Sequence, residues 1–82
     1  MITFVEKNSW DIIRTGKIIR HCEKYTVHHK SGNTTRIMRY DIFDKVPKTV
    51  QDFLDSAELV SRYDFPGDGV KTNRKYERFV KA

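Results

Sequence analysis

Residues 17–40 read KIIRHCEKYTVHHKSGNTTRIMRY, and the turn inside this stretch decides the fold. Two runs rich in β-branched and aromatic residues flank Lys30-Ser31-Gly32-Asn33, a composition typical of a hairpin loop. With Gly32 in the left-handed conformation that glycine tolerates well, a three-residue loop pairs His29 with Asn33. The register that follows predicts the cross-strand pairs Tyr25–Ile37, Val27–Thr35 and Glu23–Arg39.

This register sorts the side chains of the hairpin onto two faces, because neighbours along a strand point in opposite directions. The face with Tyr25 and Val27 is the better candidate for the core. The opposite face is predicted to contain Arg20, Lys24, Thr26, His28 and Arg36, interleaved with Cys22, Met38 and Tyr40. Cations beside a side chain that can stack, here Tyr40 or His28, suit single-stranded nucleic acid. The alternative is an ordinary exposed sheet face whose lysines discourage edge-to-edge pairing.

The segment before this hairpin favours further strands. Residues 2–5 (ITFV) indicate a short strand that Asn8-Ser9 interrupts, and residues 10–14 fit either a strand or a helical turn. Thr15-Gly16 is a turn signal placed symmetrically between two apolar runs, which favours a first hairpin.

After residue 40, the period of the apolar residues becomes helical. Pro47 suits the first turn of a helix, where its missing N–H costs nothing. The helix is predicted to extend to Ala57 on the spacing of Val50, Phe53, Leu54 and Ala57. Residues 59–64 alternate as another strand. The prediction is a single α+β domain over residues 1–82, a small antiparallel β-meander packed against one or two helices.

Residues 71–81 are predicted to form the second helix. At about 100° per residue, one side of this helix is cationic and the other apolar. The cations are Lys71, Arg74, Lys75, Arg78 and Lys81, and the apolar side has Tyr76, Phe79 and Val80. We expect these cations to lie along the phosphates of a nucleic acid. The alternative is the solvated face of a C-terminal helix.

Charge is segregated along the chain. Residues 1–40 contain eight Lys or Arg against three Asp or Glu, residues 41–69 three against seven, and residues 70–82 five against one. Two basic blocks around an acidic one indicate organised surfaces rather than a dispersed excess of charge. The acidic block either contacts a basic partner protein or is the solvated side of the predicted helix.

The sequence also indicates a compartment. No run approaches the roughly 18 apolar residues of a membrane span, and the N-terminus lacks the pattern of a secretory signal. Cys22 is the single cysteine, which fits a reducing compartment. We therefore expect a cytoplasmic protein without membrane contact. A chain of 82 residues buries only a modest core, so a homodimer that buries extra surface is left open.

These features predict a non-enzymatic, basic nucleic-acid-binding protein, with RNA ahead of DNA as the partner and without a cofactor. The predicted binding residues are Arg20, Lys24, His28, Lys30, Arg36, Tyr40, Lys71, Arg74, Lys75, Arg78 and Lys81. The first alternative is an inhibitor that docks on a host protein by charge complementarity.

The second alternative is a small metal-dependent nuclease. Asp64 and Asp68 around Phe65-Pro66-Gly67, with Glu77, would hold Mg²⁺ in such an enzyme, but the same residues are what a turn requires. A zinc site is not expected from His21, Cys22, His28 and His29. Neighbouring strand residues point to opposite faces, and the usual ligand spacings are missing.

Three features resemble the small accessory proteins of T4-like lytic bacteriophages. They are the opening strand Met1-Ile2-Thr3-Phe4-Val5, the hairpin of residues 25–33 and the basic, aromatic C-terminus. The resemblance implies a role in host takeover or counter-defence, for instance a basic protein that blocks a host toxin or nuclease through bound RNA. It implies no catalytic residues.

Overall fold

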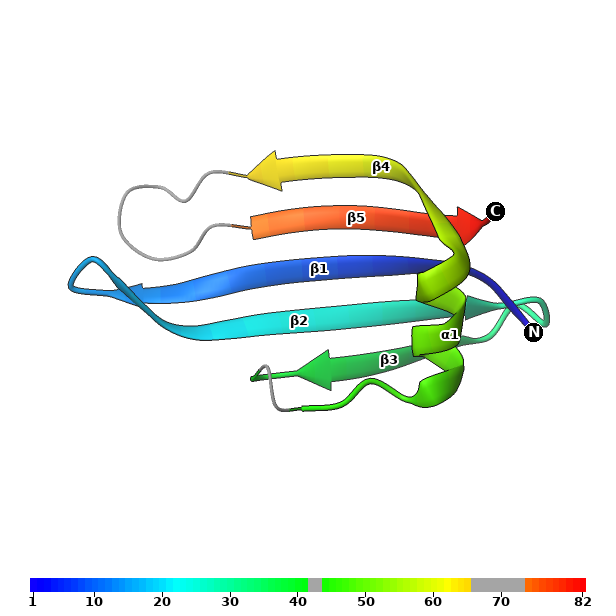
Figure 1. The fold of residues 1–82 in the computed structure, drawn as a ribbon, viewed down its shortest axis with the longest axis horizontal. Helices are drawn as coiled ribbons and strands as arrows, with labels where there is room; N and C mark the ends of the chain where they lie inside the picture. Colours follow the sequence, from blue (N-terminus) through cyan, green and yellow to red (C-terminus); the bar gives the residue numbers. More distant parts are fainter. Residues whose placement is uncertain (42–43, 66–73) are drawn as a thin grey trace.

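A computed structural model describes residues 1–41, 44–65 and 74–82. In these ranges the chain forms one antiparallel five-stranded sheet and one helix, so the predicted α+β class and β-meander are confirmed. In chain order the elements are β1 (Ile2–Arg14), β2 (Lys17–His29), β3 (Thr34–Arg39), α1 (Lys48–Ser56), β4 (Ala57–Phe65) and β5 (Arg74–Lys81). The strand order is β3-β2-β1-β5-β4, and α1 crosses one end of the sheet (Figure 1).

The two longest strands, β1 and β2, form the predicted first hairpin. They pair along their length from Ile2–His29 to Arg14–Lys17. Thr15 and Gly16 connect them with φ angles of 48° and 75°, the left-handed pair typical of a two-residue hairpin turn. Residues 10–14 are therefore strand. The interruption expected at Asn8-Ser9 is wrong, because hydrogen-bonded partners on both sides hold these residues extended.

The second hairpin has the predicted register. Glu23 pairs with Arg39, Tyr25 with Ile37 and Val27 with Thr35. The His29 N–H donates to the Asn33 carbonyl over 2.9 Å, and Gly32 has a φ of 91°. The glycine thus provides the left-handed residue that closes the loop.

The helix predicted over residues 71–81 is wrong, because residues 74–81 form strand β5. This strand lies in the sheet between β1 and β4 and pairs with both. Tyr76, Phe79 and Val80 are residue types that favour strands. Pairing with a strand on each side stabilises this conformation more than the helical spacing of the charges stabilises a helix. Lys71 lies outside the described residues.

The core lies where α1 packs on the sheet. Its buried members are Val5, Tyr25, Val27 and Val50. Ile2, Ile37, Val46, Phe53 and Leu54 are partly buried against them. The helix starts after Pro47, whose carbonyl accepts hydrogen bonds from the N–H groups of Val50 and Gln51. The predicted helix is therefore confirmed, with Phe53 at the margin of the core rather than inside it.

The strain at Thr15 predicts a stabilising substitution. A β-branched residue is unfavourable at a φ of 48°, whereas asparagine tolerates this region and is preferred in such turns. Thr15→Asn should raise the free energy of unfolding by about 0.5–1 kcal/mol, measured by urea denaturation. Gly16→Ala, at a φ of 75°, should lower it by more than about 1 kcal/mol. An unchanged midpoint for Thr15→Asn would contradict the turn geometry.

The position of Phe53 sets the size of its contribution. Truncating a fully buried phenylalanine to alanine lowers the free energy of unfolding by about 3–5 kcal/mol, and truncating a partly buried one lowers it by less. Phe53→Ala should lower the free energy of unfolding by about 2–3 kcal/mol. Gln51→Ala, on the exposed side of α1, should change it by less than about 0.5 kcal/mol. Equal effects of the two substitutions would show that α1 does not pack as described.

Candidate nucleic-acid interface

Alternation along the strands gives the sheet two different faces. We call the side that α1 packs against the helix face and the opposite side the open face. The core residues Val5, Tyr25 and Val27 lie on the helix face, so the residues adjacent to them along the strands lie on the open face.

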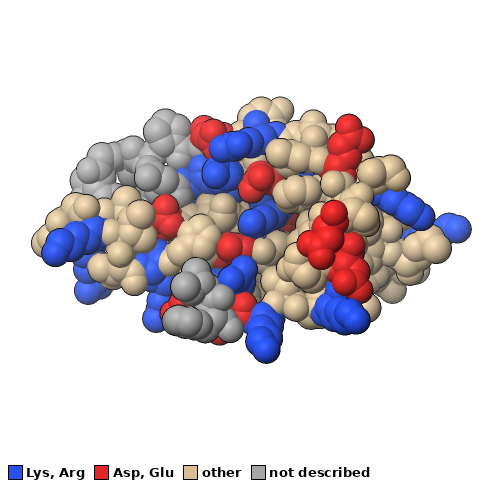
Figure 2. Space-filling model, in the orientation of Figure 1, with Lys and Arg blue, Asp and Glu red and all other residues tan. Residues whose placement is uncertain are grey.

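Positive charge is concentrated on the open face. Leaving aside the hairpin tip at residues 13–19, the described strands place there the cations Arg20, Lys24, Arg36, Arg74 and Arg78, and the carboxylates Glu6 and Glu58. On the helix face, five strand cations meet four strand carboxylates, and α1 adds Asp52 and Asp55 against Lys48. Figure 2, which views the molecule from the α1 side, shows blue and red groups intermingled there. The open face is therefore the one suited to a polyanion.

Aromatic side chains lie among these cations. The open face contains Phe4, Trp10, His28, Tyr63 and Tyr76. The Phe4 and His28 rings stack with centroids 3.9 Å apart and planes 12° apart. The Arg78 guanidinium lies 4.3 Å from the centroid of the Phe4 ring, within the range of a cation–π contact. Tyr63 lies across from Tyr76, with ring centroids 6.2 Å apart.

The carboxylate of Glu6 ties part of this face together. It accepts hydrogen bonds of 2.7 Å from the Tyr76 hydroxyl and 2.7 Å from His28 Nε2. The Tyr76 bond, with His28 and Arg78, lowers the pKa of Glu6 although burial opposes the shift. Burial and the Glu6 contact raise the pKa of Tyr76 to about 12. The negative charge of Glu6 is thus compensated within the face, which reduces its repulsion of a bound anion.

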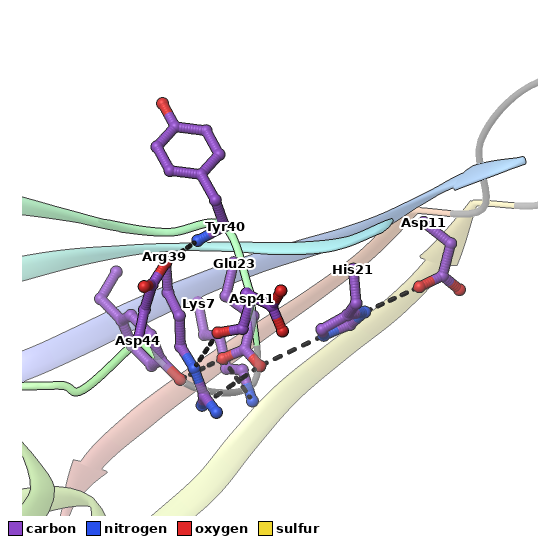
Figure 3. Close-up of polar contacts among 9 residues, drawn as sticks. Lys7, Asp11, His21, Glu23, Arg39, Tyr40, Asp41 and Asp44 are labelled. Atoms are coloured by element: carbon purple, nitrogen blue, oxygen red, sulfur yellow. Dashed lines mark hydrogen bonds and ion pairs between the residues drawn. The ribbon is translucent and has the colours of Figure 1, made fainter. Parts of the chain in front are cut away.

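Of the ten predicted binding residues that the structure describes, six lie together on the open face. Arg20, Lys24, His28, Arg36, Arg74 and Arg78 share the open face. Lys30 is exposed in the turn after β2, and the exposed Tyr40 follows β3, its ring pointing away from Arg39 (Figure 3). Lys75 and Lys81 are on the helix face by alternation. The expected single stripe of tail cations is therefore wrong, because a strand sends neighbours to opposite sides.

Sequence reasoning missed most of the aromatic residues of this face. Phe4, Glu6, Asn8 and Trp10 alternate along β1, and Arg74, Tyr76 and Arg78 along β5. The period of two was present in both segments. It was obscured by the expected break at Asn8-Ser9 and by the helical reading of the tail.

A different polar cluster, centred on Glu23, lies on the helix face away from α1 (Figure 3). Glu23 is only 7% exposed, and its carboxylate accepts a hydrogen bond from the Tyr25 hydroxyl. Lys7 Nζ and Arg39 Nη1 lie 3.5 and 3.6 Å from its oxygens. His21 bridges Glu23 and Asp11 through its two ring nitrogens, at 3.2 and 2.7 Å.

This cluster shifts the titration of its buried groups. Burial alone would raise the pKa of Glu23, but the Tyr25 hydroxyl, Lys7, Arg39 and His21 together lower it. Burial and the contact with Glu23 raise the pKa of the Tyr25 hydroxyl. Glu23 thus remains ionised with its partners arranged around it, joining β1, β2 and β3.

The candidate metal ligands are not gathered at one point in the part of the chain that the structure describes. There, no three His, Cys, Asp or Glu side chains are placed to hold a metal ion. Asp68, a candidate nuclease residue, lies outside that part. Within the same ranges, no helix has the length and apolar character needed to cross a membrane.

Comparison with known proteins finds no relative of this chain. No protein-family model, curated protein or solved structure matches the chain.

The lowered pKa of Glu23 predicts how stability depends on pH. A carboxyl group whose pKa is lower in the folded protein stabilises it above its ordinary value of 4.5, and this contribution is lost as pH falls through the folded pKa. Glu23→Gln should lower the free energy of unfolding at pH 7 by about 1–3 kcal/mol and make its decline below pH 4.5 shallower. Urea denaturation at pH 7, 5 and 3 measures both effects.

The matched control is Glu58→Gln, which removes an exposed carboxylate from β4. Its curve should follow that of the unchanged protein at all three pH values, because exposed charges contribute little. A Glu23→Gln protein with the original stability and pH dependence would show that the cluster does not stabilise the fold.

Proposed function

We propose that this protein binds single-stranded nucleic acid, RNA ahead of DNA, across the open face, and that it acts by binding rather than catalysis. The observation that carries the proposal is the arrangement of five cations and several aromatic rings, among the described residues, on the sheet face opposite α1. Proteins that bind single strands combine these two elements, a cationic track and stacking platforms. The compartment we propose is the cytoplasm.

The cations are spread across the sheet in a way that suits the flexible sugar-phosphate backbone of a single strand. Arg36 is on β3, Arg20 and Lys24 on β2, and Arg74 and Arg78 on β5. Neighbouring strands are about 5 Å apart, so the track from β3 to β5 crosses about 15 Å. Each phosphate that meets a Lys or Arg releases condensed counterions, which gives sequence-independent affinity.

The aromatic groups favour an unpaired strand over a duplex. Bases in a duplex are stacked on one another and present only their edges, whereas unpaired bases can stack on protein rings. The neutral side chains of Asn8, Thr26 and Thr34 lie on the same face and offer hydrogen bonds to a 2′-hydroxyl. The preference for RNA rests on these groups.

A pair of double variants tests the open face against the rest of the surface. Arg20→Gln with Arg36→Gln removes two open-face cations, and Lys45→Gln with Lys48→Gln removes two exposed cations at the start of α1. Fluorescence anisotropy of a labelled single-stranded RNA should show weaker binding by the first variant. Its slope of log affinity against log salt should be about 1.4 units shallower, or ~0.7 per lost phosphate contact. The second variant should match the unchanged protein.

Two outcomes would overturn the proposal. Equal losses of RNA affinity in both double variants would mean that binding depends on the net charge of the protein and not on a particular site. An unchanged protein that binds no single-stranded RNA or DNA, even at low salt, would remove nucleic acid as the partner and favour a protein target.

A further inference from the structure

The open face contains a hollow next to Trp10. Its volume is about 540 Å³, within the range of small-molecule sites, and its described lining is Asn8, Trp10, Lys24, Arg74 and Lys75. These residues come from the three central strands β2, β1 and β5. They include a ring, an amide and the open-face cations Lys24 and Arg74, whereas strand alternation places Lys75 on the helix face. No carboxylate is among these described residues.

The pairing of the strands explains why a hollow forms here. Asn8, a short side chain on the middle strand, lies between the long side chains of Lys24 and Tyr76. In the next row Trp10 lies between Arg74 and the small, buried Cys22. Long side chains around two short ones leave a depression whose floor is Asn8 and whose wall is the indole.

We infer that this hollow binds one unpaired nucleobase together with the phosphates on either side of it, an inference that rests on the proposed function. The indole ring of Trp10 offers a stacking surface, and the Asn8 amide offers a donor and an acceptor for the edge of the base. Lys24 on one side and Arg74 on the other are placed for the two phosphates. A base within a duplex does not enter, because it is already stacked and paired.

The chemistry of the lining separates this hollow from a general anion site. Inorganic phosphate or a bare sugar-phosphate chain would use the cations but leave the indole and the amide without a partner. An intact strand uses all of them. Binding of a base is therefore expected to change the surroundings of Trp10, which is the only tryptophan in the chain.

The experiment titrates the protein with two eight-nucleotide single strands, an oligoadenylate RNA and an abasic strand of the same length. Emission from Trp10 and fluorescence anisotropy are followed together. The RNA should quench the emission as it binds, and the abasic strand should bind at least tenfold more weakly without quenching. Quenching by the abasic strand to the same extent would overturn the inference, and this arm does not depend on any variant.

Two substitutions locate the effect. Asn8→Leu fills the floor without changing charge, and should weaken RNA binding about tenfold or more at an unchanged salt slope. Gln51→Leu places a leucine on the exposed side of α1, away from the open face, and should bind as the unchanged protein does. Circular dichroism confirms that both variants fold.

The outcomes distinguish this inference from the proposed function. If Asn8→Leu binds and quenches normally while the Arg20 and Arg36 variant loses affinity, the open face binds nucleic acid but the hollow does not hold a base. If the unchanged protein binds neither RNA nor DNA at low salt, the proposed function fails and the hollow has no strand to receive.

Discussion

The pairing register of β1 and β2 is the constraint on which the rest of this structure depends. These two strands of 13 residues form the centre of the sheet, and the two-residue turn at Thr15-Gly16 fixes how they align. Strand β5 pairs with β1 and strand β3 pairs with β2, so the alignment of the central pair also determines which side chains of β3 and β5 lie on each face. A slip of one residue would turn Val27 and Tyr25 toward solvent and place Lys24 and Thr26 under α1.

The same register divides the stabilising groups and the proposed binding groups between the two faces. Helix α1, which is short, covers one end of the sheet, and the described apolar core beneath it is small. The Glu23 cluster joins β1, β2 and β3 on the rest of that face. Buried ion pairs gain little over an apolar core, but removing one partner is costly, so this cluster favours one alignment of the strands. The cations on the opposite face take no part in that core, although Arg78 packs against the Phe4 ring.

Much of the fold could be predicted from local sequence, whereas the tail could not. The loop at Gly32 and the spacing of Val50 and Phe53 determine their elements locally, and both predictions are confirmed. In residues 74–81 the cations fit a helical period, while Arg74, Tyr76 and Arg78 also fit a period of two. The choice between them depends on β1 and β4, which are distant in sequence. The loop at Gly32 also made it possible to predict that the cations of β2 and β3 share one face. The position of the aromatic residues of β1 and β5 on that face could not be predicted in this way.

The strand conformation of the tail also changes what the protein can present to a ligand. In a helix, Tyr76 would have been turned away from the cations and buried as an anchor. In β5 it lies between Arg74 and Arg78 on one face, with Phe4 and Trp10 on the adjacent strand. Charge and stacking surface are thus interleaved rather than placed on opposite sides. This arrangement allows one extended strand to satisfy its phosphates and its bases on the same surface, which an amphipathic helix cannot offer.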